Sequence, residues 1–190
     1  IDHPDRIILY TKCGTLFAKA AKIRATKNAN SIQSRRIQLL RATTQLRQLL
    51  KSKETLVVPG CYDAMSAKVM ELVGFPAVYM TGYGTSLALL GMPDAGLATM
   101  TEMHLNARYM ANAVKVPLIA DADNGYGNAI NVIRCVREYI QTGAAAIHIE
   151  DQAIPKRCGH VAGRRVIPMA EAVGKYRAAA DVRDELDPDF

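Results

Sequence analysis

The chain has 190 residues, of which 49% are hydrophobic and 22% are charged, as is typical of a globular domain with a sizeable core. Its formal net charge is +6, but residues 1–53 alone carry a net +10 and the rest of the chain carries −4. No apolar run approaches the roughly 18 residues that cross a membrane, and the absence of Trp removes the best base-stacking side chain. The sequence therefore argues against a membrane or nucleic-acid partner.

The basic, acid-poor segment 1–34 predicts a poorly ordered leader, with organelle targeting as the alternative. Cytoplasmic location is the default expectation, because the four cysteines form no CxxC pair and indicate neither a disulfide framework nor a zinc site. A first helix is predicted within residues 31–53, where apolar residues recur at helical spacing.

From residue 55 onward, short apolar strands alternate with helical patterns. We predict strands at 55–60, 77–84, 116–127 and 145–152, and helices at 64–74, 99–115, 128–143 and 168–186. Such alternation produces βαβ units on a parallel sheet. A (β/α)8 barrel has about 31 residues per unit, so residues 55–190 correspond to its first four units, ending where a fifth strand would begin. We therefore predict a partial TIM-barrel domain over 35–190, with an open four- or five-stranded sheet as the alternative.

Acidic residues gather where the predicted strands end. Asp121 and Asp123 follow the third strand, and Asp94 and Glu150 can reach the same edge if the strands are neighbours. Four oxygen donors without His or Cys partners favour a hard cation, Mg²⁺ or alternatively Mn²⁺. The structural alternative is that Asp121 and Asp123 cap the following helix and its turn.

The segment PKRCGH, residues 155–160, places one cysteine in a basic setting. Lys156, Arg157 and His160 flank Cys158, and neighbouring cations favour the thiolate form. Gly159 permits a mobile loop. The alternative is a surface loop with an incidental cysteine.

The ordered segments PGCYDAMSA, VYMTGYG, GMPDAG, IADADNGYGN, IHIEDQ and PKRCGH resemble the isocitrate lyase/phosphoenolpyruvate mutase superfamily. Within it, they are most similar to the 2-methylisocitrate lyase and 2,3-dimethylmalate lyase branch, over about residues 36–190. The resemblance implies Asp121 as direct Mg²⁺ ligand, with Asp94, Asp123 and Glu150 holding the ion through water. It implies Cys158 as catalytic acid, supported by His160, with Tyr79 as a candidate base. The implied substrate-binding residues are Tyr79, Thr81, Gly82, Tyr83, Asp121, Lys156, Arg157, Gly159 and His160.

The resemblance thus implies an Mg²⁺-dependent lyase that cleaves a 2-hydroxy di- or tricarboxylic acid to a keto acid and a carboxylate, with a small carboxylic acid as its partner. The same scaffold carries phosphonate-forming phosphorylmutases and oxaloacetate decarboxylases, which are the chemical alternatives. A truncated, non-catalytic fragment is the third hypothesis. Because a half barrel leaves two sheet edges exposed, we expect a homo-oligomer.

Overall fold

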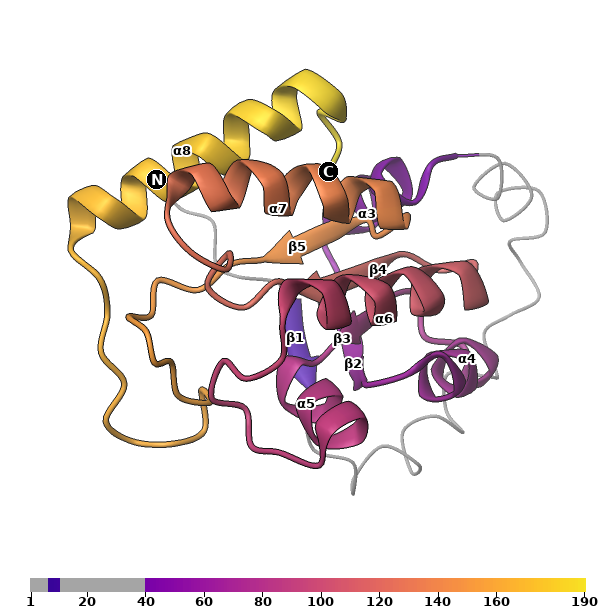
Figure 1. Cartoon of the computed structure of the whole chain (residues 1–190). Coiled ribbons are helices and arrows are strands. Elements are labelled where there is room, and N and C mark those ends of the chain that lie inside the picture. Colours follow the sequence, from indigo (N-terminus) through magenta and orange to yellow (C-terminus); the bar gives the residue numbers. More distant parts are fainter. Residues whose placement is uncertain (1–6, 11–39) are drawn as a thin grey trace.

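The computed structural model describes residues 7–10 and 40–190 (Figure 1). Within these residues one parallel sheet has the strand order β1-β2-β3-β4-β5. Its strands are β1 (Ile7–Tyr10), β2 (Leu56–Cys61), β3 (Val78–Met80), β4 (Leu118–Asp121) and β5 (Ala146–His148). The order follows the chain without the reversal of a doubly wound sheet, so the structure agrees with the predicted barrel-type fold.

The helices are α3 (Ala42–Leu50), α4 (Ala64–Val73), α5 (Gly82–Leu90), α6 (Met100–Ala113), α7 (Ala129–Thr142) and α8 (Met169–Leu186). The four helices predicted after residue 55 are confirmed with small shifts at their ends. The prediction missed α5, because the strand expected over 77–84 ends at Met80. The Thr81 side chain then accepts a hydrogen bond from Gly84 N and begins a helix. The glycine-rich start of α5 has weak helix propensity and looked like a loop.

Only part of the N-terminal prediction falls on described residues. The predicted helix within 31–53 appears as α3 from Ala42 to Leu50, and residues 11–39 lie outside the description. Of the predicted leader, only β1 is described. It pairs in parallel with β2, with Ile7 opposite Leu56.

Local capping explains why the helices begin and end where they do. Capping boxes join Asp63 with Ser66 at α4, Thr99 with Glu102 at α6, and Asn128 with Asn131 at α7. Gly74 and Gly143 end α4 and α7 in the left-handed conformation, with φ of 104° and 87°. The chain thus returns to the sheet after each helix.

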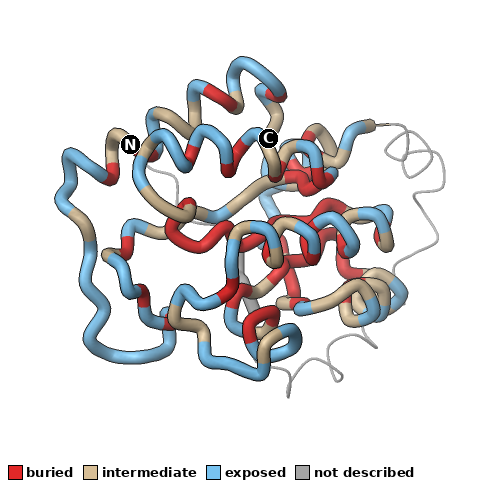
Figure 2. Tube along the Cα trace, in the orientation of Figure 1, coloured by how far each residue is buried: buried red, intermediate tan, exposed pale blue. Residues whose placement is uncertain are grey.

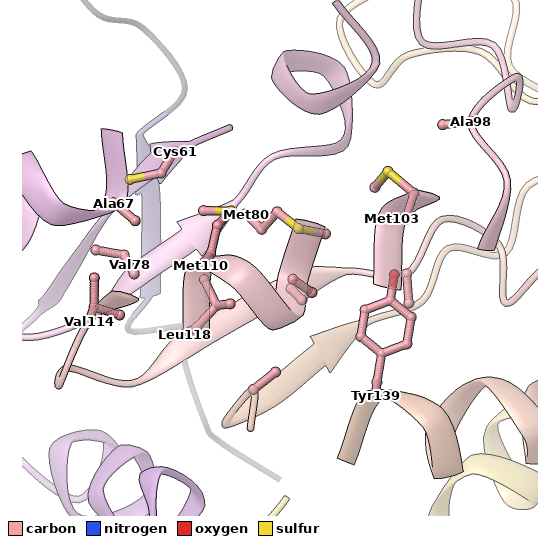
Figure 3. Close-up of a cluster of buried hydrophobic side chains, with 14 of the residues drawn as sticks. Cys61, Ala67, Val78, Met80, Ala98, Met103, Met110, Val114, Leu118 and Tyr139 are labelled. Carbon is pink, nitrogen blue, oxygen red and sulfur yellow. The ribbon is translucent and has the colours of Figure 1, made fainter. Parts of the chain in front are cut away.

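The two faces of the sheet pack against different elements. On one face, buried residues of β2, β3 and β4 contact α4, α6 and α7, among them Val78, Met110 and Tyr139 (Figure 3). On the other face, Leu46 of α3 packs with Leu56 and Val58 near the start of β2. Figure 2 shows the buried residues gathered along the sheet and the inward sides of these helices. α8 packs against α7 (Figure 1).

None of the helices in the described part of the chain has the length and apolarity needed to cross a membrane.

Candidate active site

Asp121 is the last residue of β4, and neutral donors surround its buried carboxylate. Oδ2 accepts hydrogen bonds from Tyr79 Oη at 3.3 Å and Gly82 N at 3.1 Å, and Oδ1 accepts one from Asp123 N at 2.8 Å. The α7 cap is Asn128. Neither Asp121 nor Asp123 therefore caps this helix, but both bond within the turn that follows β4, since Asp121 Oδ1 accepts from Asp123 N and Asp123 Oδ1 accepts from Asn124 N. The structural alternative is thus wrong for the helix and confirmed for the turn.

A buried lysine lies among the other three acids. Lys156 Nζ is 3.1 Å from Asp94 Oδ1, 3.3 Å from Asp123 Oδ2 and 3.6 Å from Glu150 Oε2. Its side chain is only 2% exposed. We call Lys156 and these three carboxylates the acid cluster. The ammonium supplies the positive charge that these closely spaced carboxylates require.

The charges in the acid cluster shift one another's pKa values. Burial raises the pKa of Asp123 and of Glu150 above their usual values, and the Lys156 ammonium only partly offsets this. Burial alone would lower the pKa of Lys156, but the carboxylates of Asp123, Asp121, Asp94 and Glu150 raise it well above the usual range. Lys156 therefore stays charged at neutral pH.

Tyr79 and His148 extend the site across β3, β4 and β5. Tyr79 Oη lies 3.1 Å from His148 Nδ1 as well as 3.3 Å from Asp121 Oδ2. Burial, followed by the charge of Asp121, raises the pKa of the Tyr79 phenol far above its usual value. The phenol stays protonated and is suited to donate a hydrogen bond, which counts against the predicted role as a base.

The start of α5 closes tightly on Asp121. Gly82 donates its N–H to Asp121 Oδ2, and a Cβ atom at Gly82 would lie 2.5 Å from that oxygen. A side chain at this position would therefore force the Asp121 carboxylate or the first turn of α5 to move. Thr81 begins α5 through its side chain, whereas Tyr83 is about half exposed.

Cys158 lies on the long connection between β5 and α8, residues 149–168. Its Sγ is 3.4 Å from His160 Nδ1. Arg157 Nη1 donates to Ala162 O, and the carbonyl of Gly159 accepts from Arg164 Nη1. Figure 2 shows this connection as mostly exposed, but Cys158 itself is buried. Lys156, which was predicted to be one of the basic neighbours of Cys158, instead directs its ammonium at the acid cluster.

The donor chemistry of the site fits Mg²⁺. Asp121 offers carboxylate oxygens beside the acid cluster, and Mg²⁺ is commonly held by one or two carboxylates while it keeps several waters. Within the described residues, no group of three or more His, Cys, Asp and Glu side chains could hold a metal on its own. The predicted arrangement, with Asp121 direct and Asp94, Asp123 and Glu150 through water, calls for no such group and stays a prediction.

Sequence reasoning missed three residues that support the site. His148 ends β5 and contacts Tyr79, and its position at a strand end was the available signal. Tyr139 of α7 donates to the carbonyl of Asp121 at 3.1 Å. Lys175 of α8 donates to the carbonyl of Asn124, in the turn after Asp123. The last two are helical positions that sequence cannot distinguish from ordinary packing.

We expect Lys175→Met to lower the free energy of unfolding by about 1–3 kcal/mol, because the Asn124 carbonyl loses its donor in a buried setting. Urea unfolding followed by circular dichroism measures this. Lys68→Met is the matched control, since Lys68 is half exposed and pairs with Glu71 on α4. An exposed ion pair of this kind contributes about 0–1 kcal/mol to the free energy of unfolding. Equal stability loss in the two variants would contradict a bracing role for Lys175.

Together, the fold and site define a class: a (β/α)8-type protein whose carboxyl-terminal strand ends carry a cluster of acids. The chain matches the family described as phosphoenolpyruvate phosphomutase over residues 46–190, and it belongs to this family. The family assignment made from the sequence motifs is thereby confirmed.

Curated relatives carry more than one activity. The chain is 52% identical over 151 residues to 2,3-dimethylmalate lyase of Eubacterium barkeri, covering 80% of this chain and 52% of the relative. It is 45% identical to the chloroplastic carboxyvinyl-carboxyphosphonate phosphorylmutase of Arabidopsis thaliana, covering 77% and 44%. It is 44% identical to 2-methylisocitrate lyase of Aeropyrum pernix, covering 73% and 44%. The chain thus spans about half the length of these relatives.

Solved structures similar to this chain also belong to proteins with different activities. A crystal structure of 2,3-dimethylmalate lyase, described as a PEP mutase/isocitrate lyase superfamily member, superimposes with a TM-score of 0.74 at 42% identity and covers 80% of this chain and 51% of that one. Oxaloacetate acetylhydrolase bound to 3,3-difluorooxalacetate gives 0.74 at 42% identity, covering 77% and 50%. Phosphonopyruvate hydrolase with oxalate and Mg²⁺ gives 0.71 at 33% identity, covering 80% and 50%.

Proposed function

We propose that this protein is an Mg²⁺-dependent carbon–carbon lyase acting on a 2-hydroxy di- or tricarboxylic acid of the 2,3-dimethylmalate or 2-methylisocitrate type. The observation that carries the proposal is the Cys158–His160 pair, placed on a loop whose Lys156 enters the acid cluster. The pair supplies a proton donor beside a carboxylate site suited to a hard cation. The relatives of lyase activity support the substrate class.

Mg²⁺ held by Asp121, with Asp94, Asp123 and Glu150 acting through water, would stabilise negative charge on the hydroxyl and carboxylate oxygens of the substrate. Gly82 N–H and the protonated Tyr79 phenol fix the direction in which Asp121 points. Thr81 and Tyr83 lie beside them at the start of α5 and are suited to contact the substrate carboxylate.

Cys158 has the role of general acid. The substrate hydroxyl loses its proton to water as its oxygen becomes the carbonyl of the keto acid. The electron pair of the broken carbon–carbon bond passes to the carbon next to the departing carboxylate, and the Cys158 thiol delivers a proton there. His160 Nδ1 lies close enough to return a proton to the sulfur. Arg157 is suited to bind a second substrate carboxylate.

The test is a carbonyl-trapping assay with 2,3-dimethylmalate, 2-methylisocitrate and isocitrate, in Mg²⁺ and in EDTA. We expect keto-acid product that requires the metal, and a loss of about 100-fold or more in Cys158→Ala, the range typical of a general acid. Cys135→Ala is the matched control, because it removes a buried thiol from α7 without touching the loop.

The alternatives give different results when oxaloacetate and phosphonopyruvate are tested as further substrates and the products are identified. Pyruvate from oxaloacetate, unaffected by Cys158→Ala, would indicate a decarboxylase. Turnover of phosphonopyruvate alone would indicate phosphonate chemistry: phosphoenolpyruvate as product marks a phosphorylmutase, whereas pyruvate and phosphate mark a hydrolase such as the phosphonopyruvate hydrolase described above. No product from any substrate would support the hypothesis that the chain is a truncated, non-catalytic fragment. Assembly as a homo-oligomer and a cytoplasmic location remain predictions.

A further inference from the structure

We propose that Lys156 is a positioning residue for Cys158: its ion pairs with Asp94, Asp123 and Glu150 latch the part of the connection after Gln152 onto the ends of the sheet. The sequence had suggested instead that Lys156 binds substrate. The catalytic consequence of the latch rests on the proposed function, whereas the latch itself requires neither substrate nor metal.

The geometry of Lys156 is that of an anchor. It is one of the few buried residues between Ala153 and Pro168, a stretch in which almost every neighbour is exposed. Its ammonium reaches three carboxylates from three separate segments: the α5–α6 connection, the turn after β4, and the residue two positions after β5. A single side chain therefore ties the exposed part of the loop to two carboxylates outside it, Asp94 and Asp123, and to Glu150 at the start of the same connection, whose N–H donates to Asp123 O.

The anchor is coupled to Cys158 through a compact turn. Gln152 Nε2 donates to Arg157 O at 2.9 Å, and Arg157 N donates to Gln152 Oε1 at 3.0 Å. Gln152 Nε2 also lies 2.9 Å from Glu150 Oε2, a member of the acid cluster. This clip fixes the backbone between Lys156 and Cys158, so the position of the ammonium determines where the thiol lies.

Removing the ammonium leaves three partly or fully buried carboxylates without their counter-charge. Such an arrangement is strongly unfavourable, and it is relieved when water enters and the loop moves away. Local opening of this kind exposes the loop while the packed sheet and helices stay folded. Cys158 should then become reactive, whereas Cys135, a fully buried residue of α7, should not.

The experiment measures alkylation of each cysteine by iodoacetamide, with adducts assigned by peptide mass spectrometry. It uses the full chain in EDTA. We expect Lys156→Met to raise the alkylation rate of Cys158 by about tenfold or more relative to Cys135. Lys156→Arg retains the positive charge and should stay within about threefold of the unmodified chain. Lys68→Met removes an equal charge from α4 and should change neither rate.

The ratio of the Cys158 alkylation rate to the Cys135 alkylation rate distinguishes local opening of the loop from unfolding of the whole domain. A Cys158 rate in Lys156→Met within twofold of the unmodified chain would overturn the latch. If both cysteines react together, the whole domain has unfolded, and Asp94→Asn decides instead, since it removes one carboxylate and keeps two. A selective rise at Cys158 in Asp94→Asn supports the latch, and no rise overturns it. A failed lyase assay with a positive alkylation result would reject the proposed function and leave the latch standing.

Discussion

Asp121→Asn is expected to reduce Mg²⁺-dependent product formation by about 1,000-fold or more, because an amide replaces the only carboxylate proposed to contact the metal directly. The change also disturbs hydrogen bonding. Oδ1 accepts from Asp123 N, and Oδ2 accepts from Tyr79 Oη and Gly82 N, so either orientation of the amide directs its NH₂ group at an N–H donor. One buried donor left unpaired adds about 1–3 kcal/mol of destabilisation.

Two measurements separate these effects for Asp121→Asn. Mn²⁺ titration followed by electron paramagnetic resonance reports binding directly, and urea unfolding reports stability. Asp63→Asn is the matched control, since Asp63 also follows a strand but its carboxylate caps α4 through Ser66 N and is not proposed to hold the metal. It should lose some stability and keep its affinity for Mn²⁺. Unchanged Mn²⁺ binding in Asp121→Asn would show that Asp121 is not the direct ligand.

The order of strands and helices was predictable because each signal is local. A Gly in the left-handed conformation ends α4 and α7, and Thr99 and Asn128 begin α6 and α7 through their own side chains. Apolar periodicity located the strands but extended three of them too far, since β3, β4 and β5 end at Met80, Asp121 and His148 rather than at 84, 127 and 152. Helix α5 could not be predicted from such local signals, because its first turn, Gly82-Tyr83-Gly84, depends on the Thr81 cap and on contact with Asp121.

The acids of the site were predictable for a topological reason, whereas their counter-charge was not. In a parallel sheet with sequential order, residues that follow neighbouring strands meet at one edge, so Asp121 and Glu150 had to be close. The direction of Lys156 depends on the path of a long loop, and nothing in the spacing of PKRCGH distinguishes a lysine beside Cys158 from one that faces the acids. The Tyr79–His148 contact likewise depends on side-chain directions.

Gly82→Ala is expected to reduce product formation by about 100-fold or more, because misplacing a reacting group by as little as about 1 Å can cost that much. The new Cβ would lie 2.5 Å from Asp121 Oδ2 and 3.0 Å from its Cγ. Gly82 does not have a positive φ, so alanine strains no backbone angle there. The collision alone must be relieved, either by turning the Asp121 carboxylate or by moving the first turn of α5. Both movements break the hydrogen bond from Gly82 N and release Asp121 from its fixed direction.

The same substitution at Gly174 provides the control for Gly82→Ala. Gly174 lies within α8 and has no atom within 4 Å of an added Cβ. Gly174→Ala should therefore raise the free energy of unfolding by about 0.5–1 kcal/mol, as expected for a helix interior, and leave activity unchanged. Carbonyl trapping, Mn²⁺ titration and urea unfolding are measured on both variants. Full activity and Mn²⁺ affinity in Gly82→Ala would mean that the tight approach of α5 to Asp121 is not required, and the direction of that carboxylate would then have to be set by Tyr79 and Asp123 alone.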